Sequence, residues 1–252
     1  MNNHYRTPVL LEQIITWERE YSHEVGYLEN PTGLYLGIDF NTTDGYFCTP
    51  VDCFPFADTG ADGEHFGLLT DFGFVKDLNE APVIRISPMH SDHVQLVARN
   101  LNDFFSLHFY DELLLMNDYS SEDEYLERVR QEESKDLNSE WFDHDRWKKE
   151  RAKVLNEVQE KFNLYPIADP VHYLQDIRLE RQLQIAIKTE DSLGIVRLPT
   201  AIPPEKELLL ASVRNLQFTA CSDRNIVERH AKELVGLGMT KEAESLLVRL
   251  LR

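Results

Sequence analysis

Two histidines three residues apart are the first feature of this sequence that could support chemistry. His90 and His93 could share a metal ion in a metal-dependent enzyme. A catalytic zinc needs three protein ligands, and the strong helical motif spaces its two histidines by four residues with a glutamate beside the first. No third ligand follows closely in the sequence. The spacing therefore favours solvent-exposed or capping histidines over a metal site.

A short acidic stretch rich in glycine is the second candidate. Residues 58–64 read DTGADGE and supply three carboxylates, from Asp58, Asp62 and Glu64. Calcium takes about six to eight oxygen ligands, more than this stretch offers. A hairpin turn with positive φ at one of its two glycines explains the same residues. We therefore predict a turn here, with no metal and no cofactor.

Other catalytic signatures are absent from the sequence. It has no glycine-rich phosphate loop, no GxSxG elbow and no HExxH motif. Cys53 could pair with one of the histidines as a nucleophile, but nothing in the sequence brings such a pair together. The chain holds only three cysteines, which suits reduced thiols rather than a disulfide framework. We expect a protein that is not an enzyme.

The elements that would position these residues follow from apolar periodicity. The central stretch predicts a short strand at the Phe54–Pro55–Phe56–Ala57 run, an alternating strand with Arg85 facing outward, and a helix capped by Ser91 or Asp92. Strands are expected over 54–57, 66–69, 82–87, 182–187 and 195–198, with a β-hairpin over 34–51. Helices are expected over 8–21 (with Thr7 as N-cap), 92–107, 122–133, 145–162, 205–216, 222–236 and from Thr240 as N-cap to the end.

These elements predict an α+β fold with one twisted, mainly antiparallel sheet, flanking helices and a mostly helical C-terminal part. We expect a domain over 1–110, an acidic helical connector over 111–164, and a smaller α+β and helical part over 165–252. Residues 237–247 (LGMTKEAESLL) are typical of one unit of a helical-hairpin repeat, but no second copy follows at a fixed period.

Net charge limits the classes of partner. The formal charge is -18, which argues against nucleic acid and against an anionic membrane surface. No apolar run approaches the roughly 20 residues that span a bilayer, and the N-terminus does not read as a signal peptide. We therefore expect a cytoplasmic protein that binds a protein partner, without membrane insertion.

The central stretch resembles the SUKH superfamily, which includes Smi/Knr-type regulators, Syd-type proteins and many bacterial immunity proteins. The resemblance covers roughly a quarter of the chain, within residues 54–105. It rests on the Phe54–Ala57 run, the turn with Gly60, Asp62 and Gly63, the strands at 66–69 and 82–86, and the helix that ends at 100–105. The segment NPTG at 30–33 departs from the family pattern, and residues 110–151 and those after 165 lie outside it.

This resemblance implies a non-catalytic binding module, and many members of the superfamily neutralise basic toxins. The candidate partner-binding residues are Asp58, Asp62, Glu64 and Asp71, combined with exposed aromatic side chains. The alternative is a regulatory or adaptor protein of the same fold without a toxin partner, which would bind through its C-terminal helices. Truncation near residue 165 should then discriminate, because only the toxin-neutralising protein would keep binding.

Overall fold

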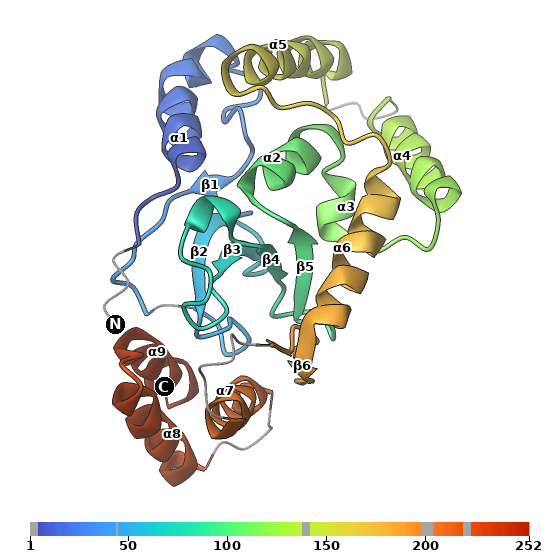
Figure 1. The fold of residues 1–252 in the computed structure, drawn as a ribbon. Coiled ribbons are helices and arrows are strands. Elements are labelled where there is room, and N and C mark those ends of the chain that lie inside the picture. The colour runs from blue at the N-terminus through green and yellow to red at the C-terminus, as the bar shows by residue number, and fades with distance from the viewer. Residues whose placement is uncertain (1–4, 44, 138–141, 198–203, 219–222, 252) are drawn as a thin grey trace.

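A five-stranded antiparallel sheet lies at the centre of the computed structural model, which describes residues 5–43, 45–137, 142–197, 204–218 and 223–251 (Figure 1). Its strands follow one another in chain order, from β1 to β5. They are β1 (Tyr35–Leu36), β2 (Cys53–Asp58), β3 (His65–Leu69), β4 (Val83–Ile86) and β5 (Val94–Ala98). The predicted α+β class, with one mainly antiparallel sheet and a helical C-terminal part, is confirmed.

Helices surround this sheet and make up most of the C-terminal part (Figure 1). A two-stranded ribbon of β6 (Ile185–Ile187) and β7 (Ile195–Val196) interrupts them. The α-helices are α1 (Val9–Tyr21), α2 (Leu101–Tyr110), α3 (Leu113–Met116), α4 (Glu122–Leu137), α5 (His144–Phe162), α6 (Pro170–Gln184), α7 (Pro204–Leu216), α8 (Arg224–Gly236) and α9 (Thr240–Leu250). The described residues also include two 3₁₀ turns, Ser22–Glu24 and Leu78–Glu80.

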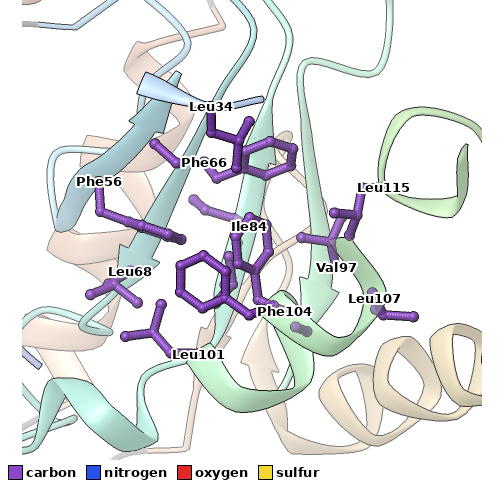
Figure 2. Packing of buried hydrophobic residues seen from close by; sticks show 14 of the residues in the cluster. Leu34, Phe56, Phe66, Leu68, Ile84, Val97, Leu101, Phe104, Leu107 and Leu115 are labelled. Atoms are coloured by element: carbon purple, nitrogen blue, oxygen red, sulfur yellow. The ribbon is translucent and has the colours of Figure 1, made fainter. Parts of the chain in front are cut away.

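One face of the sheet packs on α2, as Figure 2 shows. Phe104 of α2 lies against Phe56 and Phe66, with ring centroids 5.1 and 4.9 Å apart. Leu68 and Ile84 are fully buried in the same cluster. Burying side chains of this size supplies about 1.5–3 kcal/mol each, so this cluster is the main source of stability.

A second apolar cluster joins the C-terminal helices to two loop residues of the sheet. Val51, just before β2, and Phe72, just after β3, pack with α7, α8 and α9. The helices contribute Leu210, Ala211, Val213, Val227, Ala231, Leu234, Ala243 and Leu246. The loop before β2 and the loop after β3 are therefore both packed against the C-terminal helices.

The predicted hairpin over 34–51 is wrong. β1 has only two residues and pairs with β2, where Tyr35 lies opposite Asp58. The segment 46–51 forms turns whose carbonyls accept bonds from the C-terminal part of the chain. Gln217 donates to the Thr49 carbonyl at 2.6 Å, and Arg249 donates to the same carbonyl at 2.9 Å. These distant donors take the place of a strand partner.

The predicted helix over 92–107 is wrong in its first half. Residues 94–98 form β5, which pairs with β4. The helix begins only at Leu101, and its N-cap is Asn100, whose side chain accepts the Asp103 amide at 2.9 Å. Ser91 and Asp92 do not cap it. The β-branched Val94 and Val97 suit a sheet, and pairing with β4 outweighs the apparent helical spacing.

Arg85 is also placed differently from the prediction. It is buried, not outward, and its guanidinium donates to the Leu115 carbonyl at 3.1 Å and to Gln95 at 2.6 Å. The predicted caps Thr7 and Thr240 are replaced by Pro8 and Met239, which make no side-chain cap bond. Within the described ranges, no helix has the length and apolarity that a bilayer crossing requires.

Candidate functional site

The acidic stretch predicted as a turn is the tip of the β2–β3 hairpin. Gly60, Asp62 and Gly63 have φ values of 77°, 52° and 71°. Asp58 accepts the Gly60 amide at 2.6 Å, and the Thr59 amide donates to the Glu64 carbonyl at 3.1 Å. Positive φ suits glycine and is tolerated by aspartate, which explains this composition. The turn therefore needs no metal to account for its residues.

Two tyrosine rings enclose this turn. A Cβ at Gly60 would lie only 2.6 Å from the Tyr35 ring, and a Cβ at Gly63 would meet the Tyr46 ring. Both glycines thus allow an aromatic ring to lie directly on the backbone. Tyr35 is 71% exposed and Tyr46 is 45% exposed, so both rings also face solvent.

Two further apolar side chains extend this exposed region. Met89, in the turn between β4 and β5, is 79% exposed, and Phe47 is 43% exposed. The Phe47 ring lies 5.2 Å from that of His93, which belongs to the same turn as Met89. We call this region the hairpin-end surface and define it by Tyr35, Tyr46, Phe47, Asp58, Asp62 and Met89.

Glu64 and His90 lie at the base of the hairpin-end surface. Glu64 is buried and accepts the Ser87 hydroxyl at 2.9 Å, while His90 is exposed with its Nε2 3.6 Å from the Glu64 carboxylate. His93 instead contacts the Ser87 carbonyl at 3.2 Å and stacks on Phe218. The described residues contain no group of three histidines, cysteines or carboxylates that could hold a metal ion. His90 and His93 thus serve different contacts.

A threonine and a histidine form a buried pair beneath Tyr46. The Thr49 hydroxyl lies 3.1 Å from His65 Nε2, and His65 Nδ1 lies 2.8 Å from the Gly63 carbonyl. A hydroxyl beside an imidazole resembles a nucleophile with its base. However, Thr49 is 0% exposed and His65 is 5% exposed, and burial lowers the pKa of His65. The pair therefore connects the loop at 46–49 to the hairpin and is closed to solvent.

Asp71 lies at the other end of β3, away from the hairpin tip. It is buried and forms two bonds with Arg181 of α6, at 2.7 and 2.6 Å. Arg214 of α7 is fully buried between Asp52 and Asp191, at 2.8 and 2.9 Å, and lies 3.5 Å from Asp71. These five residues form a buried ion cluster that connects the sheet to the C-terminal part. Asp71 is thus an interior residue.

The electrostatics of this cluster follow from burial and charge balance. Burial raises the pKa of Asp52, and Arg214 offsets only part of that effect. Burial also tends to lower the pKa of Arg214, but the three neighbouring carboxylates outweigh it, so the pKa lies above the ordinary value. Removing either arginine would leave buried carboxylates without a counter-charge, which is costly. The cluster therefore holds the C-terminal part of the chain against the sheet.

The sequence predicts four acidic residues together with exposed aromatic side chains for the partner surface, but it does not say which aromatic residues these are. Asp58 and Asp62 lie on it, Glu64 lies beneath it, and Asp71 is remote. The four large apolar residues on it are Tyr35, Tyr46, Phe47 and Met89. The two turn glycines are the one signal that could have pointed to a close aromatic contact, and they do not say which rings make it.

No protein-family model matches this chain, and a search of curated proteins finds no match. The SUKH resemblance and the function that it implies remain predictions.

Proposed function

We propose that this protein is a non-catalytic, acidic binding module whose hairpin-end surface holds a basic protein partner. The SUKH resemblance suggests a toxin domain as that partner. The observation that carries the proposal is the gathering of four exposed large apolar side chains beside Asp58 and Asp62 at one end of the sheet. Aromatic residues and methionine are enriched in protein interfaces, and a few such anchors supply most of the binding energy.

The rigidity of the hairpin tip supports binding. Tyr35 and Tyr46 rest on glycine backbone, and the Tyr46 amide donates to Thr49 at 3.0 Å. An anchor that is already fixed loses less entropy on association. The net charge of -18 would also attract a basic partner over a distance and speed up encounter.

Two further observations support a non-catalytic protein of the cytoplasm. The Thr49–His65 pair is closed to solvent, and its hydroxyl and imidazole bond to each other and hold the loop in place. Cys48 and Cys53 are both free and buried, as expected for a reducing compartment. Burial raises the pKa of Cys53 to about 12, which keeps its thiol protonated and unreactive.

The test is direct binding to the product of the gene immediately upstream in the source genome, at low salt. Replacing both Tyr35 and Tyr46 by serine should weaken binding by about tenfold to a hundredfold, because hot-spot anchors carry 2 kcal/mol or more. Tyr165→Ser is the matched control, since Tyr165 is 53% exposed and lies between α5 and α6. Far-UV circular dichroism checks that each variant is folded.

A charge variant tests the electrostatic part of the proposal. Asp62→Asn keeps a side chain that tolerates the positive φ but removes one negative charge. It should slow association and reduce the salt dependence of the rate, with a small effect on dissociation. If the upstream product is not bound, or if the tyrosine variant binds it as tightly as the wild type, the proposal fails. Binding that is lost only on changing the C-terminal helices would favour the adaptor alternative.

A further inference from the structure

An open groove of about 650 Å³ runs between α8 and α9. Figure 1 shows these two helices side by side at one end of the molecule. None of the residues that define the hairpin-end surface lines this groove. It is therefore a separate feature of the molecule.

The groove exists because the apolar surface of the two helices extends beyond the stripe that packs in the second apolar cluster. The inner stripe, with Val227, Leu234 and Leu246, is fully buried in the second apolar cluster. The outer stripe includes Val235, which is 52% exposed. Leu247, Val248 and Leu251 also belong to it and are half-buried, whereas Ala231 and Ala243 line the groove but are buried in the second apolar cluster. A single helical hairpin cannot bury both of its faces, which is why such hairpins usually stack on another helical unit.

Charge at this end of the molecule differs from that of the rest. Residues 224–251 hold five Lys and Arg against four Asp and Glu, whereas the whole chain holds 26 against 44. Repulsion between two copies of a strongly acidic protein is therefore weakest here. Arg224 and Lys232 lie on the α8 wall of the groove with Glu228, and Glu244 lies on the α9 wall.

These charges are complementary to their own copies. Lys232 is four residues before the end of α8, and Glu244 is four residues after the start of α9. In an antiparallel hairpin the two residues stand at the same height on opposite walls. With a two-fold axis along the groove, α8 of one copy lies on α9 of the other, and Lys232 of each copy faces Glu244 of the other. The symmetry therefore gives two equivalent ion pairs.

We propose that this groove binds the same groove of a second copy, so that two α8–α9 hairpins form a symmetric four-helix bundle. Ala231 and Ala243 lie on the buried floor of the groove, and their small side chains leave room between its walls for apolar side chains of the second copy. The apolar outer stripes would be buried between the copies. The hairpin-end surface would stay open in both, so this proposal and the proposed function stand or fall separately.

The test is sedimentation velocity of the full chain over a hundredfold range of concentration. The wild type should move from monomer to dimer. Lys232→Glu and Glu244→Lys should each weaken dimerisation by about tenfold or more, because each places like charges opposite one another. The variant that carries both changes should recover the wild-type affinity, since the pair is restored with its sign reversed.

Two exposed positions give matched controls. Arg229→Glu and Glu233→Lys make the same changes of charge on α8 outside the groove, and neither should weaken dimerisation. Urea unfolding confirms that each variant is folded. A wild type that stays monomeric at every concentration would overturn the proposal, even if it captured an amphipathic helical peptide in the groove. A double variant as weak as the single ones would overturn it as well.

Discussion

At the scale of single residues, Arg214 carries a large expected energetic effect. It is 0% exposed and lies within bonding distance of Asp52 and Asp191. Arg214→Met should lower the free energy of unfolding by about 3–5 kcal/mol, because it leaves buried carboxylates without their counter-charge. Urea denaturation followed by circular dichroism measures the loss.

The matched control for this prediction is Arg224→Met. Arg224 forms an ion pair with Glu228 at 2.9 Å, but its side chain is 77% exposed. Exposed helical pairs of this spacing are worth about 0.3–0.5 kcal/mol. Equal losses in the two variants would contradict the distinction between buried and exposed pairs.

Lys241 gives the second prediction at the residue scale. Burial lowers its pKa to about 8, while its ammonium lies 3.2 Å from the centre of the Phe54 ring. The unfolded chain keeps this proton up to about pH 10.4, so between the two values the unfolded state binds more protons. Stability due to this residue should therefore rise with pH across that window. The contact with the ring favours the charged form and offsets part of the effect.

The measurement compares Lys241→Met with the wild type by urea unfolding at pH 7, 8, 9 and 10. The wild type should gain stability relative to the variant as the pH increases. Lys148→Met, at an exposed position of α5, is the control and should show no such trend. If the free energies of unfolding of the wild type and Lys241→Met differ by the same amount at every pH, the buried lysine does not cause the pH dependence of stability.

At the scale of elements, the boundary between β5 and α2 can be tested by its cap. Asn100 accepts the Asp103 amide, and Asn100→Ala should cost about 1 kcal/mol of stability. Asp92→Ala should cost less than about 0.5 kcal/mol, since Asp92 is exposed and caps no helix. Thermal unfolding of both variants decides the point, and a larger loss at Asp92 would favour a helix that begins there.

The same boundary shows what sequence could and could not predict about the elements. The β2–β3 hairpin, β4 and helices such as α5 follow from local signals, which are the turn glycines and the apolar periodicity. The spacing of Val94, Val97 and Leu101 also fits a helix, so the sequence alone assigns β5 wrongly. Only pairing with β4 decides between the two, and pairing is a long-range contact.

Long-range contacts also explain the errors at the candidate site. Asp71 follows β3 in the sequence like any exposed turn acid, but Arg181 lies 110 positions away and holds it inside. The carbonyl of Thr49 likewise receives its donors from Gln217 and Arg249. Composition revealed the acidic tip of the hairpin correctly, because turn geometry is local. Which aromatic rings cover that tip depends on the folded chain.

At the scale of the whole molecule, the C-terminal part completes the central sheet. α6 lies along β5, where Arg178 donates to the Leu96 carbonyl at 3.2 Å and the Tyr173 hydroxyl accepts the Arg99 amide at 2.9 Å. These contacts satisfy backbone groups that an edge strand would otherwise expose. Arg181 and Arg214 neutralise Asp71 and Asp52 from the same part of the chain. The sheet thus depends on residues after 165 at its edge and at its loops.

A chain of residues 1–165 should therefore fail to fold cooperatively. It would keep the α2 core but lose the cover of β5 and leave Asp52 and Asp71 buried without an arginine. We expect a weak near-UV circular dichroism signal, no sharp urea transition, and aggregation through the exposed edge. Adding residues 166–252 as a separate polypeptide should restore the transition, because it resupplies the same contacts. A fragment that unfolds cooperatively alone, with the stability of the full chain, would contradict this account.

If residues 1–165 do not fold, truncation near 165 removes binding through unfolding alone. Partner binding therefore has to be mapped with surface variants of the full chain.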